Sequence, residues 1–290
     1  MSQKPNLAAA EEFIWLNARL LDRHRFSYLF LGGDSEPVIQ ALRAYRNPDG
    51  GFGHAIEPDL RTPTSQPTGV WAAFEVLDEV ERFDDPMVQE ACDFLVSVST
   101  PDGGAPFVLP TAMAHPRGPW WQTDDHPPGS IIQTGAIAGL LHKHGVEHPW
   151  LGPATDFCWR VAETMEETTP YQVRFLLPFL EHVPDRERAE AALECIAPKI
   201  FEQGLVALDP NAAGEAHFPL DYAPYPQSLA RRIFTDVQIE ADLDRLARGQ
   251  AADGGWTFNW AAWNPATTHE WRAHVTIAAL KTLRAYGRID

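Results

Sequence analysis

Apolar residues recur with helical spacing along most of the chain, and two kinds of segment alternate. Segments such as 67–80 and 130–141 are apolar on nearly every side, which is typical of helices buried on most sides. Segments such as 85–98 and 235–248 carry one apolar stripe and a charged face. No segment alternates apolar and polar residues convincingly over five or more positions, so we predict an all-α protein without a substantial sheet. The other predicted helices are 7–31, 35–45, 150–165, 171–180, 185–203 and 269–286.

A short turn sequence, Asp-Gly-Gly, recurs between these segments. It begins at Asp49, Asp102 and Asp253, which are 53 and 151 residues apart, close to one and three periods of about 50. Gly152 and Gly204 stand near the two skipped positions. A period of this length indicates stacked supersecondary units. The alternation of helix types then predicts two concentric layers, with inner helices lining a barrel and outer helices wrapping it.

Six inner helices can be counted but only five clear outer ones, so one outer helix is expected to be missing or irregular. Segment 228–234 is the weakest inner candidate. A single repeat domain over 1–290 accounts for the length better than two domains. Hydrophobic residues make up 44% of the chain, with 10 Trp and 15 Phe, which favours a large core or an aromatic-lined cavity.

The formal net charge is −17, which argues against nucleic-acid and anionic-membrane partners, because both need clustered Lys or Arg. The chain has no apolar signal core near its start and no apolar run long enough for an integral membrane segment. Cys92, Cys158 and Cys195 are odd in number and far apart, so we expect buried free thiols in a reducing cytoplasm. The predicted location is therefore cytoplasmic.

The segment after the first turn has the composition of a site. His54, Glu57 and Asp59 bring three ionisable side chains of different types within six residues, and Pro58, Pro63 and Pro67 stiffen the backbone. We predict that these three are catalytic, with Glu57 or Asp59 as general acid or base. Arg61 and Gln66 follow as predicted substrate-binding residues. The alternative is a solvated connecting loop.

Two further long loops, 103–129 and 205–226, are expected to share one end of the two-layered fold with the first. Asp125 and His126 join the catalytic candidates, beside Asp124. A set of His, carboxylate and aromatic side chains at one mouth would form an active site. The predicted substrate-binding residues are Arg61, Gln66, Trp120, Trp121, Gln133, Tyr222, Tyr225 and Trp271. A bound divalent metal, Zn or Mg, stays open, with His274, His126 and Asp59 as candidate ligands in no tight spacing.

Two motifs carry a resemblance to a known superfamily. Gln250 to Trp256 reads Q-x3-G-x-W, and residues 47–53 read NPDGGFG. Both resemble the repeat of the squalene–hopene cyclases, oxidosqualene cyclases and protein prenyltransferases. The last segments also resemble actinobacterial proteins of unassigned function that carry this repeat. The resemblance implies an (α/α)6 toroid with its cavity inside the inner ring.

The catalytic motifs of that superfamily are incomplete here. Asp242-Leu243-Asp244-Arg245 lacks the last Asp of the cyclase D-x-D-D motif, and we expect Asp242 to face solvent on an outer helix. His274 falls where the prenyltransferase zinc His would lie, but the accompanying D-x-C pair is missing.

The leading hypothesis is an enzyme that acts on a small, apolar, isoprenoid-like substrate by acid–base, carbocation-type chemistry. One alternative is a non-catalytic toroid that binds a lipid or a peptide. Another is a polysaccharide lyase or hydrolase, for which Glu57 with Asp124 or Asp125 is the available carboxylate pair. The sequence leaves the oligomeric state open.

Overall fold

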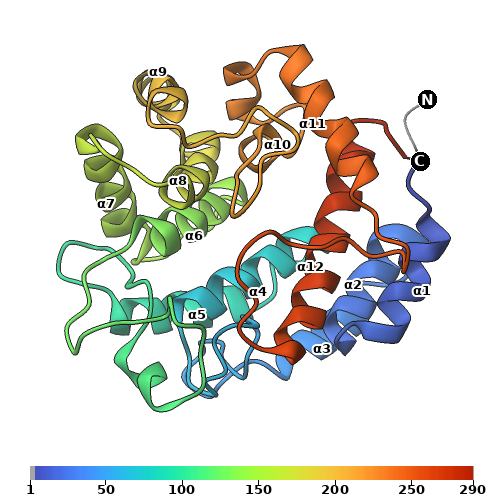
Figure 1. Ribbon diagram of the computed structural model, residues 1–290. Helices are drawn as coiled ribbons and strands as arrows, with labels where there is room; N and C mark the ends of the chain where they lie inside the picture. Colours follow the sequence, from blue (N-terminus) through green and yellow to red (C-terminus); the bar gives the residue numbers. More distant parts are fainter. Residues whose placement is uncertain (1–3, 290) are drawn as a thin grey trace. The chain divides into compact units, whose positions relative to one another are not determined.

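The computed structural model describes residues 4–289, and its regular secondary structure is helical. Within that range, twelve α-helices and two short 3-10 helices are joined by loops (Figure 1). Strand-type pairing among the described residues is limited to three isolated bridges, one of which joins Leu60 to Arg117. The predicted all-α class is confirmed.

The chain divides into two compact units. We call residues 32–196 the middle unit, and residues 4–31 with 197–289 the terminal unit. The closed toroid and the single domain over 1–290 therefore stay predictions, and residues 1–3 and 290 lie outside the described residues.

The middle unit is built around α6, which packs against α4, α7 and α8. Gly135 and Gly139 allow α8 to approach closely, because a Cβ added to either would lie 2.6 Å from the backbone of Phe175 or Pro178. This contact explains the small residues in an otherwise apolar helix. The elements of this unit are α3 (Glu36–Arg43), α4 (Pro67–Glu79), α5 (Met87–Val98), η1 (Pro110–Ala114), α6 (Ile131–Lys143), α7 (Leu151–Thr164) and α8 (Pro170–His182), followed by the start of α9 (Arg186–Glu202).

The terminal unit is built around α12, which packs against α1, α2 and α11. The predicted single helix 7–31 is wrong, because Ala18 adopts an extended conformation between α1 and α2. The predicted helix 228–234 is reduced to a 3-10 turn. The elements are α1 (Leu7–Asn17), α2 (Leu20–Leu31), α10 (Pro219–Tyr222), η2 (Leu229–Ile233), α11 (Asp236–Arg248) and α12 (Pro265–Ala285).

The three Asp-Gly-Gly turns close in the same way. The first glycine of each has a positive φ of 85° to 90°, which a residue with a side chain adopts only with strain. The residue two positions before the Asp donates its N–H to the carbonyl of the second glycine. These bonds are Asn47 to Gly51 at 2.9 Å, Thr100 to Gly104 at 2.9 Å and Ala251 to Gly255 at 2.8 Å.

Each turn also docks on a helix in the same way. A Cβ added to the first glycine would lie 2.0 to 2.3 Å from a backbone carbonyl oxygen of that helix. The second glycine packs against a Phe ring four residues further along the same helix. The helix residues are Glu90 and Phe94 of α5, Pro153 and Phe157 of α7, and Ala9 and Phe13 of α1. The repeat therefore includes a Phe on the docked helix as well as the turn.

The two skipped repeat positions do not carry this turn. Gly152 lies inside α7, where nothing would contact an added Cβ. Gly204 follows α9 with a φ of 64° and open space around it. The interpretation of these two glycines as repeat markers is wrong, because neither docks on a helix.

The cysteines are only partly as expected. Cys92 and Cys158 are buried free thiols, and burial raises the pKa of Cys92 to about 12 and raises that of Cys158 as well. Cys195 is exposed, so the prediction that it is buried is wrong. Among the described residues, no helix has both the length and the apolar character to cross a bilayer.

Candidate functional site

The loop after the first turn, residues 52–66, has a constrained backbone. His54 and Ala55 both have positive φ values, 55° and 62°, which is uncommon for residues other than glycine. The His54 side chain is exposed, and its Nε2 lies 2.9 Å from Asn47 Oδ1. Consecutive strained residues persist where the surrounding structure holds them, and they cluster at functional sites.

The two predicted catalytic carboxylates of this loop are buried. Glu57 is 6% exposed and Asp59 is 3% exposed, and Glu57 Oε1 accepts a hydrogen bond of 3.3 Å from the backbone N–H of Asp59. The backbone of the loop is fastened to residues 116–118, since Arg61 donates to Pro116 O at 3.0 Å and Gly118 donates to Asp59 O at 2.8 Å. The solvated-loop alternative is wrong for residues 56–60, which are all buried. The catalytic roles of His54, Glu57 and Asp59 stay predictions.

Gln66 joins the first loop to the second. Its side chain is buried, its Oε1 accepts from the Leu109 N–H at 2.8 Å, and its Nε2 donates to Thr111 Oγ1 at 3.0 Å. Arg61 is half-buried and donates from Nη1 to Pro58 O at 3.3 Å. The contacts of Gln66 are those of a structural link, and its substrate role and that of Arg61 stay predictions.

An apolar cluster fills the space between these two loops. It consists of Leu60, Val108, Ala112 and Trp121, and Phe107 packs against it. The Trp121 ring stacks on Phe107 with centroids 4.5 Å apart, whereas Trp120 is 39% exposed. Gln133 is 1% exposed and donates from Nε2 to Phe107 O at 3.2 Å. Of the predicted substrate-binding residues, Trp121 and Gln133 thus both contact Phe107.

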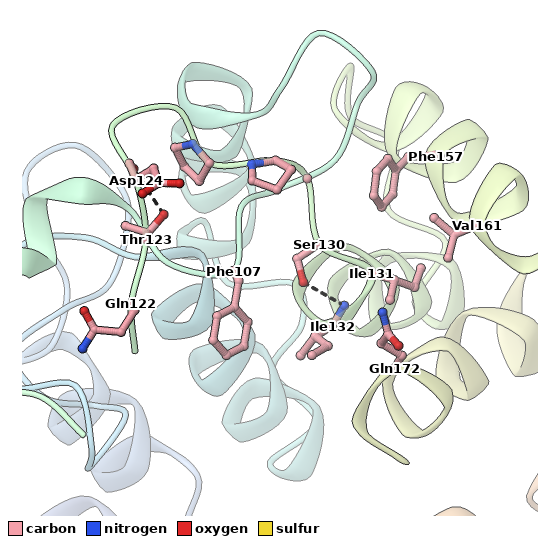
Figure 2. Close-up of a pocket in the computed structure, with 13 residues that line it drawn as sticks. Phe107, Gln122, Thr123, Asp124, Ser130, Ile131, Ile132, Phe157, Val161 and Gln172 are labelled. Carbon is pink, nitrogen blue, oxygen red and sulfur yellow. Dashed lines mark hydrogen bonds between the residues drawn. The ribbon is translucent and has the colours of Figure 1, made fainter. Parts of the chain in front are cut away.

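A cavity of about 420 Å³ lies under the second loop, entirely within the middle unit (Figure 2). Its residues come from five places along the chain: the start of the second loop, the loop end at 122–130, the first turn of α6, one face of α7, and Gln172 of α8. The apolar lining is made by Phe107, Pro127, Pro128, Ile131, Ile132, Phe157 and Val161. The polar side chains are Gln122, Thr123, Asp124, Ser130 and Gln172.

The repeat geometry positions this cavity. The ring of Phe157 contacts Gly104 of the second turn, and the same residue lines the cavity. Ser130 caps α6, because its Oγ accepts from the Ile132 N–H at 3.3 Å. In Figure 2, Phe107 and Phe157 lie on different sides of the cavity, and the amide of Gln172 is directed toward Ile131.

Only one of the predicted acidic residues of the second loop lines this cavity. Asp124 is a lining residue with an exposed side chain, whereas Asp125 and His126 are exposed and are not among the lining residues. Sequence reasoning missed Phe107, Phe157, Val161 and Gln172. A signal existed for Gln172, which follows Thr169 with the T-x-x-Q spacing of a capping box.

The terminal unit gathers aromatic residues around His274. The rings of Trp271 and His274 are perpendicular with centroids 5.5 Å apart, and Trp260 contacts Trp271 at 5.1 Å.

Asp22, which is fully buried, pairs with Arg25 at 2.8 Å and Arg19 at 2.9 Å. Burial alone would raise the pKa of Asp22, but the two arginines, with a smaller effect of His274, lower it overall.

The two predicted tyrosines of the terminal unit differ in exposure. Tyr222 is buried and donates from its hydroxyl to Leu205 O at 2.7 Å, whereas Tyr225 is 40% exposed. The substrate-binding roles of both tyrosines and of Trp271 stay predictions.

Asp242 does not face solvent, contrary to expectation. It is 3% exposed, and its carboxylate accepts from Leu220 N–H at 2.8 Å and from Arg245 Nε at 2.6 Å. Burial raises its pKa, although Arg245 acts in the opposite direction. Asp242 therefore fastens α10 to α11.

The metal candidates do not form a ligand set. Among residues 4–289, no group of three or more His, Cys, Asp or Glu side chains is arranged to hold a metal ion. Of the three candidates, His126 is exposed on the second loop and Asp59 is buried in the first.

Comparisons with known proteins bear on the fold of this chain and not on its function. No family model and no curated protein matches this chain. Among solved structures, the crystal structure of a protein from Actinoplanes is similar, with a TM-score of 0.60 and 18% sequence identity over 97% of this chain and 89% of that one. At this identity the likeness shows the fold alone, so the all-helical architecture of this chain is one that a protein from Actinoplanes shares.

Proposed function

We propose that this protein is an enzyme that binds a small, apolar, isoprenoid-like molecule in the cavity of the middle unit and acts on it by acid–base chemistry. The observation that carries the proposal is the cavity itself. Its volume of about 420 Å³ lies within the ~300–1,000 Å³ usual for small-molecule sites. Its walls combine a largely apolar surface with a few polar groups, which is the usual composition of such sites.

The lining favours an apolar substrate body. Ile131 and Phe157 are 4% and 6% exposed, while Phe107, Ile132 and Val161 are half-buried. A ligand that covers the three half-buried side chains removes their remaining apolar surface from water, at about 25 cal/mol for each Å². Burial of that surface is the main source of affinity in this proposal.

Asp124 is the group we assign to the acid–base step. Of the described residues that line the cavity, it is the one with an ionisable side chain. A carboxylate beside the substrate can act as a general base, and it can stabilise positive charge that develops during the reaction. The faces of Phe107 and Phe157 would add to that stabilisation through their ring electrons.

A second candidate is a binding protein without catalysis. The same lining supports this candidate. Acid–base catalysis commonly uses one group to remove a proton and another to supply one, and the described lining residues include one ionisable side chain, Asp124. Turnover separates the two candidates. If mass spectrometry finds conversion of a bound isoprenoid that is lost in Asp124→Asn, the enzyme is supported, and binding without conversion supports the second candidate. For either candidate we propose a cytoplasmic location, which is consistent with the buried free thiols of Cys92 and Cys158.

The binding site can be tested by filling the cavity from α7. Val161→Phe adds a ring to a lining residue. Its matched control is Val98→Phe on α5. Val98 lies four residues after Phe94, just as Val161 lies four residues after Phe157. Val98 is also half-buried, but it does not line the cavity. Calorimetry with the isoprenoid ketone geranylacetone should show at least about tenfold weaker binding for Val161→Phe and unchanged binding for Val98→Phe. Absence of binding to the wild-type protein, or equal binding to both variants, contradicts the proposal.

A further inference from the structure

The amide of Gln172 is held in one orientation at the edge of the cavity. It belongs to the capping box at the start of α8, in which Gln172 Oε1 accepts from the Thr169 N–H at 3.0 Å and from Thr168 Oγ1 at 3.3 Å. The backbone N–H of Gln172 in turn donates to Thr169 Oγ1 at 3.2 Å. With the oxygen committed to the cap, the Nε2 group is left to face another direction.

That direction is the cavity. Gln172 is a half-buried lining residue, and its amide points toward Ile131 at the start of α6 (Figure 2). No described residue accepts a hydrogen bond from Gln172 Nε2. The cap thus presents a fixed N–H donor beside an apolar wall, which is the arrangement that selects a ligand by one polar atom.

The charge of the lining limits what that polar atom can be. The side chains of the described lining residues include no Lys, Arg or His, and their ionisable member is Asp124. A diphosphate carries several negative charges and is normally held by cationic side chains or a metal ion. An uncharged carbonyl or ether oxygen needs only a donor, which Gln172 supplies. An ammonium group is itself a donor and gains nothing from an N–H.

From this geometry we infer that the ligand of the cavity is an uncharged, oxygen-bearing apolar molecule whose oxygen accepts a hydrogen bond from Gln172 Nε2. The inference rests on the proposed function and narrows it, since it excludes isoprenoid diphosphates as the substrate class. The apolar body lies against Phe107, Phe157 and Val161, and the oxygen lies at the start of α8. The partial positive charge at the start of that helix adds to the preference for an oxygen lone pair.

The test uses three probes with a common isoprenoid body: geranylacetone, its deoxy hydrocarbon, and geranyl diphosphate. Calorimetry with the full-length protein should rank the ketone above the hydrocarbon by about five- to tenfold, the usual value of one neutral hydrogen bond. The diphosphate should bind at least about tenfold more weakly than the ketone. Diphosphate binding as tight as that of the ketone, or equal affinity for ketone and hydrocarbon, overturns the inference.

The matched variant is Gln172→Glu, measured at pH 8. A glutamate preserves the capping box, because Glu and Gln both serve at this position, but an ionised carboxylate accepts and does not donate. The ketone should lose at least about tenfold in affinity, while the hydrocarbon changes by less than about threefold. Gln238→Glu is the control, since Gln238 holds the same position in the capping box of α11 and does not line this cavity. It should leave all three affinities unchanged.

The outcomes separate this inference from the proposed function. If Val161→Phe blocks binding and Gln172→Glu leaves the ketone affinity intact, the cavity is the site but the assigned donor is wrong. If wild-type protein binds neither ketone nor hydrocarbon, both the proposed function and the inference fail. The melting temperatures of Gln172→Glu and Gln238→Glu should shift by similar small amounts. This measurement distinguishes loss of the hydrogen-bond donor from unfolding of the Gln172→Glu variant.

Discussion

The first and second loops of the middle unit follow the same turn but end in different structures. Both turns use a glycine with positive φ, and both dock through a glycine on a Phe ring, Phe94 in one case and Phe157 in the other. The first loop, residues 52–66, buries the side chains of Glu57 and Asp59. The second, residues 103–129, is longer and leaves a cavity between itself and α6, α7 and α8.

The two loops also differ in the side chain at the point where each returns to its turn. At the end of the first loop, Ser65 donates from Oγ to Asp49 Oδ1 at 2.7 Å and accepts from Asn47 Nδ2 at 3.0 Å. At the end of the second, Gly129 packs against Gly104 without a side chain. A repeat that fixes the turn and the docked helix therefore leaves the loop free to vary, and the longer loop borders the space that we propose as a binding site.

The largest effect should come from the turns that the two loops share. Gly50→Ala and Gly103→Ala should each lower the free energy of unfolding by about 2–4 kcal/mol, through strain at positive φ and a clash of the new Cβ with a helix carbonyl. Gly145→Ala is the control, because Gly145 has a φ of 60° but open space, and it should cost about 1 kcal/mol. Urea unfolding checks this. Equal costs for all three would mean that the turns do not dock as described.

The wall between the two loops comes next. Trp121→Ala should cost about 3 kcal/mol, because the ring is 6% exposed and stacks on Phe107. Trp121→Phe should cost clearly less, since the buried Nε1 of Trp121 has no hydrogen-bond partner among the described residues. Thermal unfolding with matched calorimetry distinguishes the two. A negligible cost for Trp121→Ala would show that the loops are independent of each other.

These two predictions depend on features that the sequence reveals unequally. Asp-Gly-Gly and the T-x-x-Q cap are local, so the turns, the helices that follow and their approximate ends are predictable from neighbouring residues. The cavity is not, because Phe107, Asp124, Phe157 and Gln172 come together only when separate elements pack. The burial of Asp242 could not be predicted for the same reason, since the N–H group that its carboxylate accepts from belongs to Leu220 of another helix.

Removing the buried carboxylate of the first loop should destabilise the protein more than removing the exposed carboxylate of the second loop. Glu57→Ala should cost about 1–3 kcal/mol, because it removes a buried acceptor from the Asp59 N–H. Asp124→Ala should change stability by less than about 0.5 kcal/mol, since its side chain is exposed. Urea unfolding of both variants measures the contrast. A larger loss of stability for Asp124→Ala than for Glu57→Ala would contradict the burial of the first loop's carboxylate.

The last and most local prediction concerns Ser65, whose hydrogen bonds hold the end of the first loop. Ser65→Ala should cost about 1 kcal/mol, since it removes the hydrogen bonds to Asp49 and Asn47 that hold the end of the first loop. Hydrogen exchange should show faster exchange of the Gly51 and Gln66 amides in this variant, with the second loop unchanged. If the second loop responded equally, the anchor would not be specific to the first.

A crystal structure of the protein with geranylacetone would test both the proposed cavity and the assigned donor. We expect the ketone in the cavity of the middle unit, with its chain against Phe107 and Phe157 and its oxygen within about 3.2 Å of Gln172 Nε2. A ketone bound outside this cavity would contradict the assignment of the site. A ketone inside it whose oxygen turns away from Gln172 would contradict the assignment of the donor.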